Sequence, residues 1–462
     1  MEKTGLPIAA EIAVVGAGAA GMMAAIAAAE ASGLDRPGAV VRGVGSLPAA
    51  AGRNHAPRRL LVLEQLGKPG AKLLATGGGR CNLTNTLEAR EFMARFGRGR
   101  QFIRHAIAAL DGEALRTFFR GLGVETVCPD GMAVYPATQS AATVQRALYD
   151  RCLELGVQFR FGAVVKDLWV DGGVLRGLAM DGGRIDAPRV IVAAGGRSYP
   201  SLGGTGGGYE LARRGGHTIV PLTPALVDLK TRETWPRECA GISLSPARVR
   251  IDLPGAAKTG ITGDVLFTHE GLSGPAVLDL SSDVGEFLED AETHRETDAE
   301  TRRHGDAERS DVPIRLEMLP GTTPAQWRTR LEEWRQRQGP RTVRSLVGES
   351  LPARLAGVIC DLAGVGPGAK AAHLGGRERH QLVNLLPGVR LTVVGTGGFD
   401  SAMVTRGGVD VREVDGRTMQ SRRLRGLYFA GEVLDVDGPC GGFNLQWAFS
   451  SGRLAGLSAA HS

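Results

Sequence analysis

The stretch KLLATGGGRCNLTN, residues 72–85, places several chemically useful side chains directly behind three consecutive glycines. Each glycine within a regular element costs roughly 0.5–1 kcal/mol relative to alanine, so a run of three indicates backbone that must approach another group closely. Arg80, Asn82 and Asn85 bring hydrogen-bond donors and acceptors to this loop, and Cys81 brings a thiol. Such a grouping is typical of a ligand site; the alternative is a structural turn whose polar side chains satisfy only local backbone.

A second glycine-rich stretch lies near the amino terminus. Residues 12–15 are apolar, as in a buried parallel strand, and an alanine-rich segment that favours a helix follows the sequence GAGAAG. In such a GxGxxG turn, the first glycine makes the tight bend, the second admits a pyrophosphate, and the third lets helix and strand pack. We therefore predict a dinucleotide site at the helix amino terminus, formed by Gly16, Gly18, Ala19, Ala20 and Gly21.

The acidic residue expected to bind a ribose hydroxyl normally follows such a turn by about 20 positions. Here the best strand-plus-acid pattern is LLVL at 60–63 followed by Glu64, which is much further along the chain. We interpret residues 35–59 as an inserted surface loop and Glu64 as the ribose-binding acid. The alternative is that Glu64 is only a solvated strand end.

The remaining pattern predicts an α/β fold with two separated halves of one nucleotide-binding domain. Apolar runs ending in glycine recur at 189–196 and 426–432, as buried strands do. We predict a first part of the binding domain at 1–202, an inserted domain at 203–385 and a carboxyl-terminal part at 386–462. Within the inserted domain we expect a β-rich region at 203–281, a disordered loop at 283–311 and helices at 323–365.

Composition limits the classes of function. The 462 residues carry a net charge of +6, which suits an Arg-rich surface with a basic phosphate pocket and also permits an RNA partner. The six cysteines are scattered without metal-ligand spacing, so we expect reduced thiols, no metal site and a cytoplasmic protein. The apolar segment at 12–29 carries the GxGxxG glycines, so we predict neither a signal peptide nor a membrane span.

These motifs together resemble the HI0933-like (BaiN/RdsA-like) family of FAD-dependent oxidoreductases. The resemblance rests on VVGAGAAG, on EQLGKPGAKLLATGGGRCNLTN, on VIVAAGGRSYPSLGGTGGGYELA, on LFTHEGLSGPAVLDLS, on TGGF and on GLYFAGEVLDVDGPCGGFNLQWAFSSG. It spans residues 14–452, and the GGGRCNLTN and GPCGGFNLQWA strings are far more specific than the nucleotide fingerprint. It implies a two-dinucleotide-type FAD-binding Rossmann domain with an inserted β-rich plus helical domain.

The resemblance also implies where the cofactor would lie. The GGGRCN loop would lie against the flavin, and an acid after the late strand would hold the ribityl hydroxyls, either Glu432 or its rivals Asp435 and Asp437. The last helix would direct its amino terminus at the reduced flavin. Besides the GxGxxG residues and Glu64, the expected cofactor-binding residues are Lys72, Gly79, Arg80, Asn82, Val165, Ala194, Gly195, Gly196, Gly431, Glu432, Gly442, Asn444, Leu445 and Gln446.

Family members reduce C=C bonds next to a carbonyl, in steroid enones or in uridine of ribosomal RNA, and the resemblance extends that chemistry to this chain. The reaction needs a hydride, a donor to the carbonyl and a proton source. Candidate proton donors are Cys81, Tyr199, His269, Glu270 and Cys440, of which we select Cys81, His269 and Cys440 as catalytic. For any of them, a packing or surface role is the alternative.

Other hypotheses of function are consistent with the same motifs. The flavin could react with oxygen, as in an amine (aminoacetone-type) oxidase, or the protein could act on a small acid. NAD(P)H is a possible donor, although the later glycines at 203–208 do not form a second nucleotide fingerprint. An RNA-binding module without catalysis would use the arginines at 95–104 and 422–425 to contact phosphates.

Overall fold

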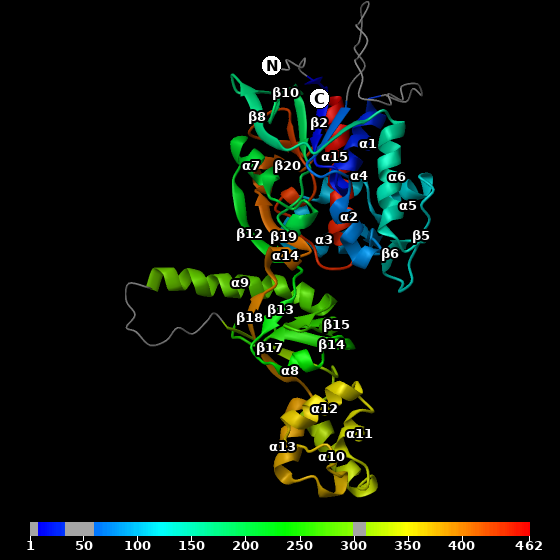
Figure 1. Ribbon diagram of the computed structural model, residues 1–462, viewed down its shortest axis with the longest axis vertical. Coiled ribbons are helices and arrows are strands. Elements are labelled where there is room, and N and C mark those ends of the chain that lie inside the picture. Colours follow the sequence, from blue (N-terminus) through cyan, green and yellow to red (C-terminus); the bar gives the residue numbers. More distant parts are fainter. Residues whose placement is uncertain (1–7, 33–59, 299–310) are drawn as a thin grey trace, which may run out of the picture. The chain divides into compact units, whose positions relative to one another are not determined.

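The computed structural model describes residues 8–32, 60–298 and 311–462, which form two compact units. Unit 1 contains the chain up to Thr223 together with Val404–Ser462, and unit 2 is Pro224–Met403 (Figure 1). The predicted loop at 35–59 lies outside the described residues. Among the described residues, no helix is long and apolar enough to cross a membrane, and no group of His, Cys, Asp and Glu could hold a metal ion.

A seven-stranded sheet forms the centre of unit 1. Its order is β20-β21-β22-β11-β2-β3-β7, and the strands from β22 to β7 pair in parallel. The four residues of β2 are all buried between two parallel neighbours, which explains why this strand reads as a continuous apolar run. The bounds are β2 Ile12–Val15, β3 Leu60–Glu64, β7 Gln158–Phe161, β11 Arg189–Val192, β20 Val414–Asp415, β21 Gln420–Ser421 and β22 Leu427–Phe429.

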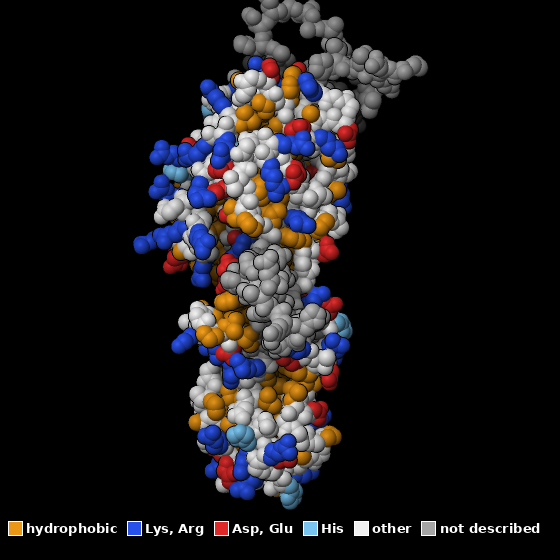
Figure 2. Space-filling model, turned by 90° about the vertical axis from the view of Figure 1, so that its left-hand side faces the viewer, with side chains coloured by type: hydrophobic (Ala, Val, Ile, Leu, Met, Phe, Trp, Pro, Cys, Tyr) orange, Lys and Arg blue, Asp and Glu red, His pale blue; other side chains and the backbone are white. Residues whose placement is uncertain are grey.

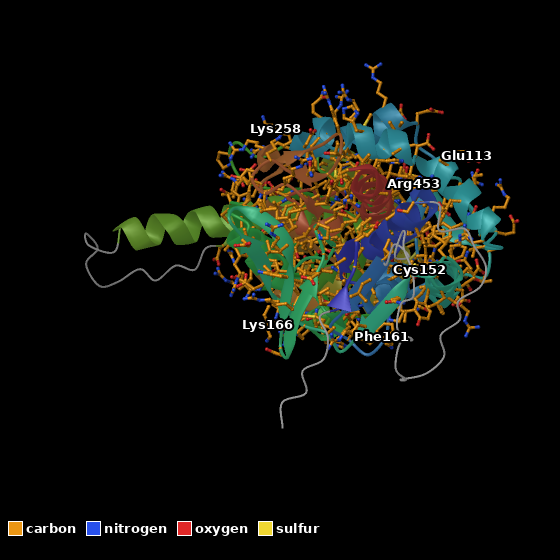
Figure 3. The ribbon with its side chains drawn as sticks, turned by 90° about the horizontal axis from the view of Figure 1, so that it is seen from above. Glu113, Cys152, Phe161, Lys166, Lys258 and Arg453 are labelled. Atoms are coloured by element: carbon orange, nitrogen blue, oxygen red, sulfur yellow. The ribbon has the colours of Figure 1, made fainter. Side chains whose placement is uncertain are left out.

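Two helices from opposite ends of the chain, α1 (Ala19–Ala31) and α15 (Phe443–His461), pack side by side (Figures 1 and 3). Their approach depends on small residues. A Cβ added to Gly452 would lie 2.3 Å from the Ala20 carbonyl oxygen, and one added to Gly456 would lie 2.2 Å from that of Ala24. The carboxyl-terminal helix therefore belongs to unit 1.

Smaller elements surround this centre. A four-stranded sheet has the order β1-β10-β9-β8, a three-stranded sheet the order β4-β6-β5, and β12 pairs with β19. The strands are β1 Ile8–Ala9, β4 Thr84–Asn85, β5 Thr126–Val127, β6 Ala133–Pro136, β8 Val165–Asp171, β9 Val174–Met180, β10 Gly183–Asp186, β12 Ile219–Ala225 and β19 Val404–Val409. The helices are α2 Ala71–Ala75, α3 Ala89–Ala94, α4 Arg104–Ala109, α5 Gly112–Gly121, α6 Ala141–Glu154 and α7 Gly207–Arg214, with short 3-10 turns η1 Thr76–Gly79, η2 Gly97–Gln101, η3 Pro200–Leu202 and η6 Gly431–Val433.

Unit 2 combines a closed β-barrel with a group of helices, consistent with the predicted β-rich plus helical composition. The barrel order is β13-β16-β15-β14-β17-β18. Its strands are β13 Leu229–Thr231, β14 Ser243–Ile251, β15 Ile261–Phe267, β16 Gly271–Ser273, β17 Val312–Glu317 and β18 Val389–Thr396. The helices are α8 Trp235–Glu238, α9 Pro275–Asp298, α10 Pro324–Arg337, α11 Val343–Val347, α12 Ala353–Leu362, α13 Gly376–Leu385 and α14 Gly398–Ser401.

The predicted disordered loop at 283–311 is wrong in its first half. Helix α9 continues to Asp298, and residues 299–310 lie outside the described residues. Val284 is buried in the core of unit 2, and Phe287 and Leu288 pack against that core. Apolar positions three and four residues apart thus extend the helix from its first turns. Charged residues dominate the sequence around these positions, which made the segment look like a disordered loop.

The unit boundaries also differ from the predicted ones at 202 and 385. Unit 1 extends to Thr223 because α7 buries Tyr209, Leu211 and Ala212 in the core of that unit. Unit 2 extends to Met403 because β18 closes the barrel by pairing with β13 and β17. The predicted boundary at 202 therefore separated α7 from unit 1, and the predicted boundary at 385 separated β18 from unit 2.

Candidate functional site

The turn between β2 and α1 gives its three glycines different tasks. A Cβ on Gly16 (φ +102°) would lie 2.5 Å from the Ala193 carbonyl oxygen, and one on Gly21 would lie 1.9 Å from the Gly16 carbonyl oxygen. A Cβ on Gly18 would meet nothing within 4 Å. The first helical turn of α1 carries no acidic side chain and no side-chain cap. The space beside Gly18 and the free amino terminus of α1 therefore suit a phosphate group.

Glu64 ends β3 next to this turn. Its Oε2 accepts a hydrogen bond from the Ala17 N–H at 2.8 Å, and its Oε1 accepts one from the Leu66 N–H at 2.8 Å. The buried carboxylate thus holds the backbone of the glycine-rich turn. Despite the long spacing from Gly21, Glu64 lies next to the turn because β3 is the direct neighbour of β2; its contact with a ribose hydroxyl stays a prediction.

The triple-glycine loop follows the short helix α2. Gly77, Gly78 and Gly79 have φ values of +57°, +65° and +84°, a left-handed backbone that favours glycine. A Cβ on Gly78 would meet nothing within 4 Å, and one on Gly79 only the Leu74 carbonyl oxygen at 4.0 Å. The loop therefore exposes bare backbone to open space.

Two asparagines join this loop to the carboxyl-terminal segment. With its amide oriented so that both atoms find partners, Asn82 donates to the Thr84 carbonyl oxygen at 2.9 Å and accepts from the Gly442 N–H at 3.3 Å. Asn85 donates from Nδ2 to the Gly441 carbonyl oxygen at 2.9 Å. Residues about 360 positions apart in the chain are thereby held together, and the two asparagines act as supports of the loop.

A second connection centres on Glu432 in η6. Lys72 Nζ donates to Glu432 Oε2 at 2.7 Å and to Ser198 Oγ at 2.5 Å. Glu432 Oε1 accepts from Ser198 Oγ at 2.9 Å and from the Thr405 N–H at 2.8 Å. The Glu432 carboxylate is therefore paired with an ammonium group and accepts three hydrogen bonds in all. It joins α2, the segment after β11 and the carboxyl-terminal part.

Sequence reasoning missed two residues of this network, Ser198 and Thr405. Both side chains are fully buried, and Thr405 Oγ1 accepts from the N–H groups of Arg197 and Ser198 at 2.8 and 3.1 Å. Ser198 stands two positions after Gly196 in the GGRSYP string, so its place beside the predicted cofactor glycines could have identified it. Thr405 lies between Val404 and Arg406 in β19 and gave no signal.

The glycines after β11 and before α15 complete the arrangement. A Cβ on Gly195 would face open space, one on Gly196 would lie 2.5 Å from Glu432 Oε1, and one on Gly431 would lie 2.9 Å from the Ala20 Cβ. A Cβ on Gly442 would lie 2.6 Å from the Thr84 carbonyl oxygen. The predicted glycine-lined segments thus converge within unit 1, at the carboxyl ends of β2, β3, β11 and β22. Ligands bind at such an edge in open α/β sheets.

Four of the residues expected to contact the cofactor have surroundings within the protein that differ from one another. Asn444 accepts from the Gly438 N–H at 2.8 Å and donates to its carbonyl oxygen at 2.7 Å, so it holds the 438–442 loop in shape. Gln446 is 1% exposed and donates to the Leu110 carbonyl oxygen at 2.8 Å. Val165 begins β8 and pairs with Met180 in the four-stranded sheet. Leu445 is half-buried beside Asn444.

The predicted proton donors have unequal environments. Cys81 is buried at the end of the triple-glycine loop, and burial raises the pKa of its thiol to about 12. Cys440 is half-buried in the 438–442 loop, and Tyr199 is half-buried before η3. His269 and Glu270 are exposed between β15 and β16 of unit 2, where Glu270 pairs with Lys230 at 2.7 Å. Cys81 and Cys440 therefore lie in the segments that converge in unit 1.

Comparison with known proteins decides the family. The family description "HI0933-like protein Rossmann domain" matches residues 39–458. The chain belongs to the HI0933-like family of FAD-dependent oxidoreductases. The converging glycine-lined backbone, the open space beside Gly18 and the supported carboxylate of Glu432 fit that cofactor.

Curated relatives of this HI0933-like protein extend over nearly its full length. It is 33% identical to the 3-dehydro-bile acid delta(4,6)-reductase of Clostridium scindens, with 97% of this chain and 98% of the relative covered. It is 30% identical to the ribosomal RNA dihydrouridine synthase of Escherichia coli, with 90% and 96% covered. Among solved structures, a quinol–fumarate reductase with menaquinol matches with a TM-score of 0.50 and 18% identity, covering 99% of this chain and 72% of that one; this likeness concerns the fold alone.

Proposed function

We propose that this flavoprotein reduces a C=C bond conjugated to a carbonyl group and that NAD(P)H supplies the electrons. The observation that carries the proposal is that a Cβ on Gly18, Gly78 or Gly195 would meet nothing within 4 Å, and that these glycines follow three neighbouring strands of one sheet, β2, β3 and β11. Both full-length relatives described above are named for reactions of this kind, the saturation of a conjugated ring. Bound FAD would supply the hydride.

The chain's own residues would bind and orient the reactants. The amino terminus of α1 and the backbone at Gly18 would take the pyrophosphate, and Glu432, fixed by Lys72, would accept from the ribityl hydroxyls. Burial raises the pKa of the Cys81 thiol to about 12, which makes it a weaker acid than an ordinary thiol. Cys440, which is half-buried in the 438–442 loop, is therefore better placed than the fully buried Cys81 to give a proton to the substrate's α-carbon.

The electron donor would bind transiently rather than in a second dinucleotide site. The glycines at 203–208 serve packing: a Cβ on Gly204 would lie 1.9 Å from the Ser198 carbonyl oxygen, and one on Gly208 3.0 Å from the Ala194 Cβ. These glycines thus lack the open space found at Gly18. NAD(P)H would then reach the flavin through the same opening as the substrate, in alternation with it.

A basic surface favours uridine in RNA as a second candidate substrate. Five arginines in the segment 90–104 are exposed, and none of them forms an ion pair with any residue that the structure describes: Arg90, Arg95, Arg98, Arg100 and Arg104. On the face in Figure 2, by comparison, red Asp and Glu side chains lie among the blue Lys and Arg side chains. Phe96 of this segment lies against Gly438 and 6.0 Å, between ring centroids, from Phe443. Unpaired arginines next to the 438–442 loop suit a phosphate backbone.

An anaerobic titration of the purified protein tests the proposal. We expect the bound flavin to be bleached by NADH or NADPH and then reoxidised without oxygen by cyclohex-2-en-1-one. A flavin that reacts rapidly only with molecular oxygen, with release of peroxide in the presence of an amine, would instead support the amine oxidase alternative. Colourless protein that binds RNA would support a module without catalysis.

The RNA candidate has its own experiment. Replacing Arg95, Arg98 and Arg100 by Gln should weaken binding of a uridine-rich RNA hairpin and reduce its salt dependence by about three phosphate contacts. The matched control replaces Arg213 and Arg214, which pair with Glu210 and Asp167, by Gln. Equal RNA affinity of the triple variant and the wild type would exclude this surface as the RNA site.

A further inference from the structure

Arg80 differs from its polar neighbours in the triple-glycine loop because its terminal nitrogens remain available. The side-chain amides of Asn82 and Asn85 form hydrogen bonds with backbone atoms of Thr84, Gly442 and Gly441. Arg80 is exposed, and its two terminal nitrogens take part in no hydrogen bond or ion pair within the part of the chain that the structure describes. The loop thus offers one uncommitted donor group next to bare backbone.

The guanidinium group is nevertheless held in place from two sides. Nε donates to the Gly77 carbonyl oxygen at 3.2 Å, and Cζ lies 4.8 Å from the centroid of the Tyr135 ring. The ring belongs to β6, which pairs with β4 immediately after the loop. A planar cation that stacks on an aromatic face and donates from Nε keeps its terminal N–H groups in one orientation. Less freedom is lost when such a group binds a ligand.

We propose that Arg80 is a catalytic residue that binds the carbonyl oxygen of the substrate; this inference rests on the function proposed above. A hydride from the reduced cofactor adds to the β-carbon of the conjugated system. The π electrons of the C=C bond then form the C=C bond of an enolate, and the former carbonyl oxygen becomes negatively charged. Transfer of a proton to the α-carbon restores the C=O bond, so the substrate gains two electrons and two hydrogens in total.

A guanidinium group suits the charged oxygen of this step. It is always protonated and donates hydrogen bonds without losing its proton, so it would stabilise the enolate while a different group, such as the thiol of Cys440, supplies the proton. Fixed donors directed at developing negative charge act strongly because they need no reorganisation during the reaction. The role differs from the cofactor contact that the sequence predicted for Arg80.

The experiment compares Arg80→Met with Arg184→Met in the full-length flavoprotein. Arg184 is a matched control, since its guanidinium stacks on Trp169 at 5.0 Å on the separate four-stranded sheet and is also exposed. Three quantities are measured: flavin content after purification, the rate of flavin reduction by NAD(P)H, and the rate at which cyclohex-2-en-1-one reoxidises the reduced flavin. A fourth is the dissociation constant of 4-nitrophenol, an enolate-like ligand, measured from the perturbed spectrum of the oxidised flavin.

For Arg80→Met we expect wild-type flavin content and reduction rate, a reoxidation rate lowered by roughly 10²–10³-fold, and weaker nitrophenol binding. Guanidinium chloride should restore part of the reoxidation rate in Arg80→Ala. Unchanged reoxidation in Arg80→Met would overturn the proposal, and so would loss of flavin, which would make Arg80 a cofactor ligand. Wild-type protein that reduces neither cyclohexenone nor uridine in RNA would contradict the proposed function itself.

Discussion

The GxGxxG turn at 16–21 and the triple-glycine loop at 77–79 use the same residue for opposite reasons. In the turn, Cβ atoms on Gly16 and Gly21 would collide with backbone at 2.5 and 1.9 Å. In the loop, a Cβ on Gly78 would meet no protein atom within 4 Å, although its φ of +65° disfavours other residues. The turn is glycine-rich because protein packs against it, whereas the loop keeps its backbone bare toward open space.

Glycines that allow close packing of the protein can thus be distinguished from glycines that leave room for a ligand. Gly18 belongs with the loop rather than with its own turn, because its Cβ would also face open space. Substitutions of the packing glycines should therefore destroy the fold, and substitutions of the open glycines should spare the fold and affect the cofactor. Three predictions test this division, from the largest expected effect to the smallest, and a fourth tests the burial of Cys81 beside the loop.

Gly21→Val should have the largest effect. The added atoms have no space between α1 and the Gly16 carbonyl group, so we expect destabilisation of at least about 4 kcal/mol and little soluble protein. Soluble yield and thermal unfolding measure this effect. Gly121→Ala in α5 is the control, because its Cβ would meet nothing within 4 Å. A Gly21→Val protein with wild-type thermal stability would contradict the close packing of α1 on β2.

Gly18→Val should leave the fold intact and abolish retention of FAD. Its Cβ would meet no protein atom within 4 Å, and its side chain would fill the space that a pyrophosphate needs. Circular dichroism and the visible spectrum of the same preparation distinguish the two effects. Normal flavin content in this variant would show that the phosphate lies elsewhere.

Gly78→Ala should lower both stability and flavin affinity by smaller amounts. A left-handed alanine costs roughly 1–2 kcal/mol, and its methyl group would point toward the proposed flavin. Gly172→Ala is the matched control, since it has a φ of +57° and equally open surroundings in the β8–β9 hairpin. Equal flavin affinity in the two variants would remove the loop from the cofactor site.

The ionisation of Cys81 should affect stability only at alkaline pH. Its pKa is about 12 in the folded protein against 9.0 as the unperturbed value, so the unfolded chain loses this proton first as pH rises. Stability should therefore fall between pH 9 and 12, by at most about 1.4 kcal/mol per pH unit from this residue. Urea unfolding across this range should show a weaker pH dependence for Cys81→Ala than for wild type. Identical slopes would indicate that the thiol is not buried in solution.

The sequence predicted those features whose cause is local. A short apolar strand, three spaced glycines and a small-residue helix are sufficient to predict β2, the turn and α1, and the specific strings placed the carboxyl-terminal part beside them. Long-range pairing was harder to predict: nothing in the sequence showed that Asn444 would hold Gly438 or that Gln446 would donate to the Leu110 carbonyl oxygen. Helix α9 was missed because its apolar positions are sparse among charged residues.

The most direct test of the central claim is the visible spectrum of purified wild-type protein alongside Gly18→Val and Gly78→Ala, with FAD quantified after acid release. We expect stoichiometric FAD in the wild type, none in folded Gly18→Val and a reduced amount in Gly78→Ala. Full occupancy in both folded variants would contradict the claim that this open, glycine-lined edge of the sheet holds the cofactor.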